Sequence, residues 1–294
     1  MPTCSAPFRS RPRRRFGRPI RARIAAAFDP KGIARRDGGD LVLSGEYSYA
    51  SGIDHAQWLI CGGFIEDGGR RSGPHFFLVP ADAAEVIDDW FAIGLEGTGS
   101  KSFGLRDVRL PLHRMLDGEQ ARIGRGAGTL ANANIIYRIP RGGVTAAGFA
   151  AMCTGIARGV LEDWLALDST RRNRAGGTWQ DAGNLVALAE ATAKIDAGHD
   201  LYTGTIRRTM DKLAAGDQPD DLDLLTARRN MSYATRLANE AGTLLFRAAG
   251  GGAIRSEQRI GQQYRNLMAA SAHFAVAWDV HGPAYAQHLV ARRP

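Results

Sequence analysis

The chain has 294 residues, 44% of them hydrophobic and 23% charged, which is typical of a soluble globular protein. No apolar run approaches the ~20 residues of a membrane span, and no apolar signal-peptide core follows the start. The net charge of +8 suggests nucleic-acid binding, but residues 1–23 hold eight arginines and no acidic residue. The rest of the sequence carries 30 basic and 30 acidic residues, so we expect no nucleic-acid partner and no membrane contact.

The cysteines and the first residues bear on where the protein resides. Three scattered cysteines form no Cys-x-x-Cys pair and no disulfide framework, which favours a reducing cytoplasm and no metal site: Cys4, Cys61 and Cys153. Four prolines within residues 1–27 prevent one continuous amphipathic helix. We expect a disordered leader or unrelated sequence ahead of a truncated gene, rather than a nucleic-acid arm or a transit peptide.

Residues 28–115 have the texture of a β-domain, with short apolar runs between glycine-rich turns. The predicted strands are Leu41–Ser44, Trp58–Ile65, Phe76–Pro80, Val86–Ile93 and Phe103–Leu110, with breaks at Asp67–Gly69 and Gly97–Gly99. This spacing predicts a small antiparallel β-barrel or sandwich.

A glycine-rich linker over residues 116–140 precedes a helical region over residues 141–294. In the first helix, apolar residues from Phe149 to Leu167 recur every three or four positions. Three more helices are predicted over Asp181–Leu213, Leu222–Ala248 and Ser256–Leu289, with a break and cap at Asp217–Asp220. The predicted fold class is therefore α+β, a β-domain followed by an antiparallel four-helix bundle.

The sequence contains no complete copy of the common phosphate-binding, dinucleotide-binding or serine-nucleophile motifs. The segment Gly94–Ser102 resembles a phosphate-binding P-loop, but Ser100 stands where that motif needs lysine. No dinucleotide fingerprint follows a predicted strand, and no nucleophile elbow presents a serine.

Several segments in order resemble acyl-CoA-dehydrogenase-fold flavoproteins, and more closely their two-component flavin-dependent monooxygenase branch, the aromatic hydroxylases. In the β-region these are Leu43–Gly52 (LSGEYSYASG), Asp89-Trp90, Gly94–Lys101 (GLEGTGSK) and Val108–Pro111 (VRLP). In the helical region they are Phe246–Ile254 (FRAAGGGAI), Gln258-Arg259, Tyr264–Asn266 (YRN) and Ser271–His273 (SAH). Acyl-CoA dehydrogenases typically carry a base glutamate where this chain reads Tyr264–Leu267 (YRNL), which disfavours α-proton abstraction.

The resemblance implies an oxygenase component that receives reduced flavin, FMNH2 or FADH2, from a separate flavin reductase. The flavin reacts with O2, and one oxygen atom is transferred to a small phenolic or aromatic substrate in a dry pocket. The family habit also implies a homotetramer. Two alternatives stay open: a desaturase or heteroatom oxygenase on the same fold, or a non-catalytic remnant acting as a subunit partner.

The resemblance also assigns roles to residues. His273 would accept the phenol proton or donate to the peroxide, and Ser51 would hydrogen-bond the flavin N5 edge. The other cofactor-binding candidates are Gly52, which allows close approach; Thr98, Gly99 and Ser100, beside the flavin or its phosphate; Gly251 and Gly252, near a neighbouring subunit's flavin tail; and Arg171, for phosphate pairing. Structural roles are the alternatives. His273 would be a histidine packed between helices, Ser51 a turn serine, and residues 98–100 a plain tight turn. Gly251 and Gly252 would form a helix C-cap, and Arg171 would be an exposed arginine.

Family members carry an N-terminal helical domain before the β-domain, whereas the resemblance here begins near Phe28. Three explanations of the missing domain stay open. The gene is truncated, another polypeptide supplies the domain, or this form of the protein no longer catalyses the reaction. We therefore expect the activity of the isolated chain to be impaired.

Overall fold

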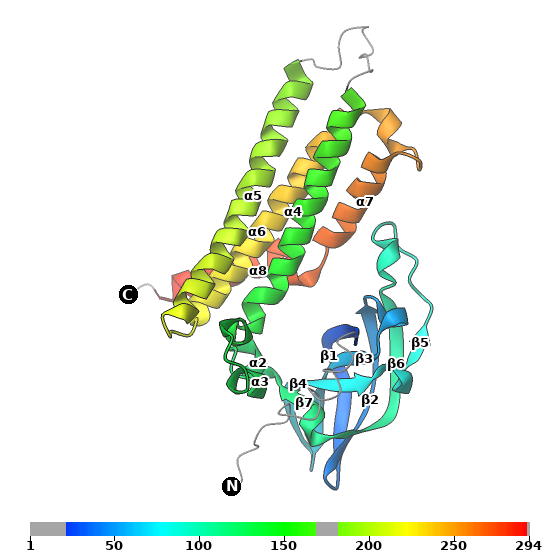
Figure 1. Cartoon of the computed structure of the whole chain (residues 1–294), viewed down its shortest axis with the longest axis vertical. Coiled ribbons are helices and arrows are strands. Elements are labelled where there is room, and N and C mark those ends of the chain that lie inside the picture. Colours follow the sequence, from blue (N-terminus) through cyan, green and yellow to red (C-terminus); the bar gives the residue numbers. More distant parts are fainter. Residues whose placement is uncertain (1–21, 169–181, 293–294) are drawn as a thin grey trace. The chain divides into compact units, whose positions relative to one another are not determined.

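The computed structural model describes residues 22–168 and 182–292, which form two compact units. The first, the β unit, contains residues 22–92 and 96–140. The second, the helical unit, contains residues 93–95, 141–168 and 182–292 (Figure 1). The expected α+β fold class is confirmed.

One seven-stranded sheet dominates the β unit, in the order β5-β6-β2-β1-β3-β4-β7. Its strands are β1 (Ile24–Asp37), β2 (Asp40–Ala50), β3 (Trp58–Asp67), β4 (Arg70–Pro80), β5 (Glu85–Ile87), β6 (Lys101–Pro111) and β7 (Met115–Asp117). Short 3-10 turns join them: η1 (Ile53–His55), η2 (Ala81–Ala83), η3 (Glu96–Thr98) and η4 (Leu112–Arg114).

Glycine pairs close the two long hairpins of this sheet. Gly38 follows β1 with a φ of 60°, and Gly68 and Gly69 join β3 to β4 with φ values of 55° and 76°. Positive φ matches the twist of tight hairpins and is readily adopted by glycine. The turn predicted at Asp67–Gly69 therefore lies where the sequence placed it.

The sheet differs from the prediction in several ways. Because β1 pairs with β3 in parallel, the expectation of a purely antiparallel domain was wrong. Strand β1 begins at Ile24, within the segment assigned to the leader, and β5 ends at Ile87 rather than Ile93. The pairings form one sheet with β5 and β7 as its end strands, so neither a sandwich nor a closed barrel is established.

The segment expected to be a linker is structured and belongs to the β unit. It holds most of β7, followed by α2 (Gly118–Arg122), α3 (Ala127–Leu130) and η5 (Ile135–Arg138). The Asp117 side chain caps α2 by accepting a hydrogen bond from the Gln120 amide at 2.9 Å. Glycine content alone misjudged this segment, because side-chain caps supply the order.

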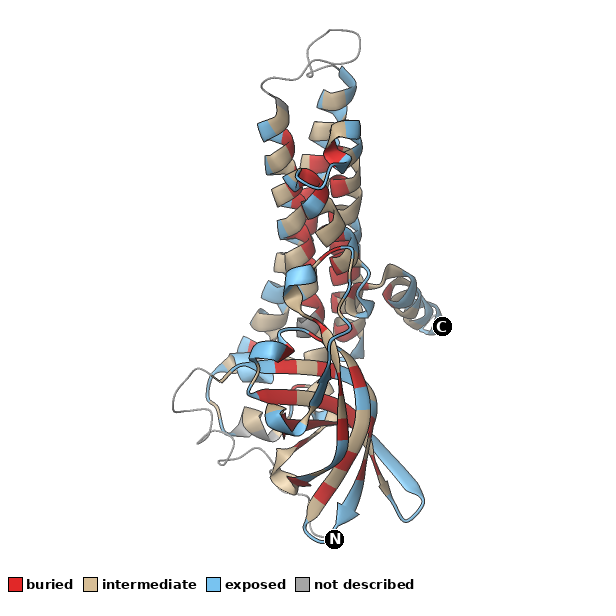
Figure 2. Ribbon diagram, turned by 90° about the vertical axis from the view of Figure 1, so that its right-hand side faces the viewer, coloured by how far each residue is buried: buried red, intermediate tan, exposed pale blue. Residues whose placement is uncertain are grey.

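Three long helices form the body of the helical unit: α4 (Arg141–Asp168), α5 (Ala182–Ala214) and α6 (Asp221–Ala248). Asp220 begins α6 through a capping box, in which Asp220 and Asp223 each accept the other's backbone N–H at 2.8 Å. The buried stripe of α4 includes Cys153, Val160 and Trp164, which pack against residues of the other helices. Figure 2 shows such buried residues along the inward helix faces.

The predicted fourth helix is not continuous. The chain after α6 forms η6 (Gly251–Ile254), α7 (Arg259–Ser271), η7 (Phe274–Val276) and α8 (Trp278–Ala291). Helix α8 points away from the three long helices (Figure 2). The simple antiparallel four-helix bundle was therefore wrong in its last member.

Within the described residues, α4 is long and apolar enough by composition to span a membrane, over Arg141–Leu167. Its apolar stripe, however, forms part of the buried core of the helical unit. A central core helix has the same composition, so this feature is weak evidence for a membrane span.

Candidate functional site

Five of the predicted cofactor-binding residues come together in the β unit, where β2 ends and β6 begins. The Ser51 and Ser100 hydroxyl oxygens lie 2.7 Å apart, and the Thr98 hydroxyl lies 2.7 Å from that of Ser100. The Gly52 amide donates to the Thr98 carbonyl at 2.8 Å, which ties the two loops together. We call Ser51, Thr98 and Ser100 the hydroxyl cluster.

The cluster has a buried end and an open end. Ser100 is 7% exposed, whereas Ser51 and Gly52 are exposed. A side chain at Gly52 would meet no atom within 4 Å, and its φ of 75° favours glycine. Backbone and hydroxyl groups are therefore presented side by side to open space, where a planar ligand can approach them closely.

Tyr49 flanks this open end and was missed by the sequence analysis. It has a φ of 63° and is 71% exposed, and its ring meets Trp90 edge-on at 6.2 Å between centroids. Strand alternation would place Tyr49 on the same side as the buried Tyr47. The positive φ is uncommon for a non-glycine residue and has no clear signature in sequence.

An ion-pair group beside the cluster was also missed. The Lys101 ammonium lies 3.1 Å from an Asp54 oxygen and 3.0 Å from an Asp88 oxygen. Hydrogen bonds to Asp88 and Asp54 raise the pKa of Lys101. This lysine therefore keeps its charge next to Ser100, although it is already paired with carboxylates.

His273 lies in the helical unit, at the turn between α7 and α8. Its side chain caps η7, because Nδ1 accepts a hydrogen bond from the Ala275 amide at 3.1 Å. The Phe149 ring stacks on the imidazole at 3.7 Å between centroids and 17° between planes. The residue is otherwise exposed, so one edge of the ring is available to a ligand.

These contacts determine the chemistry of His273. Loss of hydration against its packed neighbours lowers the pKa of His273 below its ordinary value of about 6.5, which favours the neutral ring at pH 7. With Nδ1 accepting from Ala275, the proton of the neutral ring is placed on Nε2. In this arrangement the free edge of His273 donates a hydrogen bond.

The remaining predicted cofactor residues do not join His273. Gly251 is exposed and Gly252 is half-buried, both in η6 at the other end of α7. The 13 residues of α7 span about 20 Å, so this end lies well away from His273. The positive φ after α6 falls on Gly250, at 71°, rather than on Gly251 or Gly252. Arg171 lies outside the described residues.

Acyl-CoA dehydrogenases typically carry a glutamate in the segment that corresponds to Tyr264–Leu267. In this chain, that segment contacts the backbone of residues 94 and 95. Asn266, on α7, accepts a hydrogen bond from the Leu95 amide at 2.8 Å. A side chain at Gly94 would clash with the Arg265 carbonyl, so glycine allows this close packing. Helix α7 contains no Asp or Glu that could act as a carboxylate base.

Comparison with known proteins agrees with this architecture. Residues 147–278 match the family described as acyl-CoA dehydrogenase, C-terminal domain. The oxygenase subunit HsaA of a flavin-dependent monooxygenase from Mycobacterium tuberculosis is 29% identical over 265 residues, covering 88% of this chain and 67% of HsaA. The oxygenase component of an FADH2-dependent resorcinol hydroxylase from Rhizobium sp. is 28% identical, covering 93% of this chain and 70% of that protein.

The crystal structure of M. tuberculosis HsaA has a TM-score of 0.90 and 27% identity, covering 98% of this chain and 76% of the HsaA chain. The chain is a homologue of the oxygenase subunits of two-component flavin-dependent monooxygenases. A structure of XiaF from Streptomyces sp. in complex with FADH2 and glycerol has a TM-score of 0.88 and 24% identity, which supports the fold alone.

The homology confirms the family resemblance found in the sequence motifs. This oxygenase homologue covers about two thirds of the length of HsaA. The roles of the hydroxyl cluster and His273 remain predictions, because no comparison tests individual residues.

Proposed function

We propose that this homologue binds reduced flavin, FMNH2 or FADH2, and with O2 hydroxylates a small phenolic or aromatic substrate. The observation that carries the proposal is the hydroxyl cluster beside the open backbone of Gly52. A flavin has a planar ring edge rich in nitrogen and oxygen atoms, and this surface offers short hydroxyls without a blocking side chain. When bound, the flavin supplies the electrons that activate O2 and the means of transferring an oxygen atom.

In this proposal Ser51 hydrogen-bonds the N5 edge of the flavin. Ser100 holds the Ser51 hydroxyl in place, and Thr98 holds Ser100, so the exposed hydroxyl is orientated by a buried one. Gly99 has a φ of 50°, which allows the tight turn that presents Thr98 and Ser100 together. Tyr49 supplies an exposed ring beside them for contact with the cofactor or substrate.

His273 serves in this proposal as a hydrogen-bond donor to the substrate oxygen or the activated oxygen. The bond from Ala275 to Nδ1 occupies the atom that would otherwise accept a proton. A neutral imidazole with its proton on Nε2 would stabilise negative charge on a substrate oxygen by donating a hydrogen bond to it. We favour this role over that of general base.

The partners follow from the relatives and are proposed here for this chain. A flavin reductase would supply the reduced flavin. We also propose a cytoplasmic homotetramer: the free, buried Cys61 and Cys153 suit a reducing compartment, and exposed apolar residues on α5 and α8 suit subunit contacts, among them Leu185, Val186, Leu289 and Val290. Light scattering of the purified protein measures its mass, and a monomer at micromolar concentration would contradict this assembly.

The test of function is a single-turnover reaction. The protein is mixed anaerobically with photoreduced FMN or FAD and resorcinol, and oxygenated buffer is then added. A hydroxylated product above that formed by free flavin supports the proposal. Retention of reduced flavin without product identifies a flavin-binding but inactive chain, and absence of both contradicts the proposal.

A further inference from the structure

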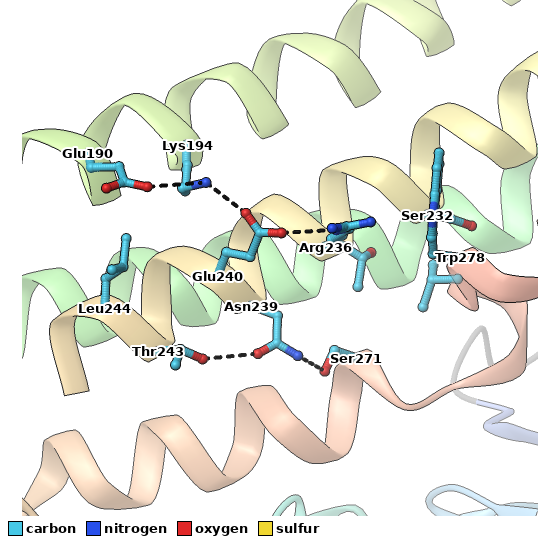
Figure 3. Close-up of a pocket in the computed structure, with 12 residues that line it drawn as sticks. Glu190, Lys194, Ser232, Arg236, Asn239, Glu240, Thr243, Leu244, Ser271 and Trp278 are labelled. Carbon is cyan, nitrogen blue, oxygen red and sulfur yellow. Dashed lines mark hydrogen bonds and ion pairs between the residues drawn. The ribbon is translucent and has the colours of Figure 1, made fainter. Parts of the chain in front are cut away.

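The helical unit contains a cavity among α5, α6 and the turn after α7, and most of its polar side chains bond to one another (Figure 3). Lys194 lies 2.7 Å from one Glu240 oxygen, and Arg236 donates to the other at 2.9 Å. The Asn239 amide donates to the Ser271 hydroxyl at 2.7 Å. A ligand would have to break one of these contacts to gain its own, so we assign no ligand to this cavity.

The β unit, in contrast, exposes apolar side chains on and just after β5 (Glu85–Ile87). Val86 is 42% exposed, Ile87 47% and Phe91 90%. Strand β5 is an end strand of the sheet, and only β6 pairs with it in the part of the chain that the structure describes. An exposed apolar stretch at a sheet edge is typical of a surface that another segment covers. We call residues 82–91 the β5 surface.

Carboxylates surround these apolar side chains. The β5 surface contains no lysine or arginine, and its four acidic residues are all exposed: Asp82, Glu85, Asp88 and Asp89. Lys101 lies 3.0 Å from Asp88 but is shared with Asp54 at 3.1 Å, and the exposed Arg106 lies 3.4 Å from Glu85. The surface therefore keeps an excess of negative charge, which favours a partner that combines cationic and apolar side chains.

The chain itself contains a segment of this chemistry. Residues 1–21 hold seven arginines, no acidic residue, and the apolar side chains of Phe8, Phe16 and Ile20. The same segment accounts for nearly all of the net positive charge of the protein. Its composition is complementary to that of the β5 surface in both charge and hydrophobicity.

This segment joins the described chain beside the β5 surface. The Arg23 amide donates to the Gln57 side chain at 2.7 Å, and the Gln57 amide donates to the Arg23 carbonyl at 2.9 Å. The Gln57 carbonyl in turn accepts from the amide of Ala81, which begins the turn before β5, at 3.1 Å. Residues 1–21 can span up to about 70 Å when extended, so every part of the β5 surface lies within their reach.

We propose that residues 1–21 bind in cis to the β5 surface. Their arginines pair with the exposed carboxylates, and Phe91 receives the apolar side chains or a stacked guanidinium. Single surface ion pairs are weak, but a tethered segment has an effective concentration on the order of millimolar, so several weak contacts suffice. The inference concerns a contact of the chain with itself and does not rest on the proposed function.

The test uses the full-length chain with a bimane fluorophore on residue 10. The Cys4→Ser and Ser10→Cys substitutions leave one reactive thiol, because Cys61 and Cys153 are buried and burial raises the pKa of both. Nearby tryptophan and tyrosine rings quench bimane, and the Trp90 and Tyr49 rings meet edge-on at the β5 surface. We expect quenched emission that is restored by about 1 M NaCl, which screens the ion pairs.

Matched variants show where the segment binds. Asp82→Lys with Glu85→Lys should at least about double the bimane emission, because two attractive contacts become repulsive. Asp200→Lys with Glu257→Lys makes the same change of net charge at exposed positions of the helical unit and should leave the emission unchanged. Phe91→Ser removes the apolar contact and should also raise the emission.

Three outcomes would overturn the inference. They are emission equal to that of the parent in the Asp82→Lys, Glu85→Lys variant, an equal rise in the helical-unit variant, and emission that rises when excess unlabelled chain is added. The last result would place the segment on a neighbouring copy instead of its own chain. Thermal unfolding shows that each variant folds, and the charge variants keep the inference testable if Phe91→Ser does not.

Discussion

The hydroxyl oxygens of Ser51 and Ser100 lie 2.7 Å apart although 49 positions separate them in the sequence. The contact joins the end of β2 to the start of β6, and the bond from Gly52 to the Thr98 carbonyl reinforces it. An exposed serine is thereby held by a buried one, which reduces the entropy lost when a ligand binds.

Replacing Ser51 with alanine should weaken binding of reduced flavin about five- to tenfold, because one hydrogen bond to the cofactor is lost. Stability should change by less than about 0.5 kcal/mol, since Ser51 is exposed. Anaerobic fluorescence titration with FMNH2 and FADH2 measures the affinity. Ser48→Ala, in the same strand, is the matched control, and equal affinities in the two variants would remove Ser51 from the cofactor site.

The role of His273 is separated by two substitutions. His273→Asn keeps a side-chain acceptor for the Ala275 amide and an N–H donor, whereas His273→Ala keeps neither. If His273 acts as a donor, the asparagine variant should retain at least about tenfold more product per flavin than the alanine variant, roughly one charge-assisted hydrogen bond. Product yields under single turnover measure this. Equal loss in both variants would instead favour a general base.

Sequence reasoning recovered the parts of the fold governed by local chemistry. The Asp67–Gly69 turn and the cap before α6 follow from residue preferences that act over a few positions. Grouping Ser51 with Thr98 and Ser100 required the family resemblance, because no local rule relates residues so far apart.

The rest depends on tertiary contacts that composition does not encode. The parallel pairing of β1 with β3 joins segments on opposite sides of β2 in the chain. The break between α7 and α8 contains no glycine or proline, and Pro283 lies inside α8 rather than at the break. There the His273 side chain bonds the Ala275 amide and replaces a helical contact.

Stability should fall as the pH drops below about 6.5, the ordinary histidine pKa. Burial lowers the pKa of His75, His273 and His281 in the folded protein. Each therefore binds protons more readily when unfolded, so acid favours unfolding from about pH 6.5 down to the lowered folded pKa. Urea unfolding at pH 7.5 and 5.5 measures the loss of free energy. His75→Gln should flatten the dependence, and a free energy independent of pH would contradict the prediction.

The capping box at the start of α6 should contribute about 1 kcal/mol. Asp220→Ala removes both the acceptor for the Asp223 amide and a negative charge near the helix N-terminus. The pKa of Asp220 is lowered in the folded protein, mainly by the hydrogen bond from the Asp223 amide. The stability that the Asp220 carboxylate contributes is therefore lost as the pH falls through its pKa in the folded state. Chemical denaturation at pH 7 compares this variant with Asp221→Ala, which changes the next acidic residue. Equal free energies of unfolding for both variants would mean that the cap is unimportant.

Phe149 should control both the stability of the α7–α8 turn and the titration of His273. Its ring covers one face of the imidazole and packs against the buried cluster that includes Met231 and Val276. Phe149→Ala should lower the free energy of unfolding by about 3 kcal/mol, the lower end of the range for this change. It should also raise the pKa of His273 towards its ordinary value, because water regains access to the ring. NMR titration of the His273 ring measures that shift. Phe246→Ala removes a ring stacked on Tyr264 instead, and should reduce stability without moving the His273 titration; a His273 pKa unchanged by Phe149→Ala would show that the stacked ring is not what lowers it.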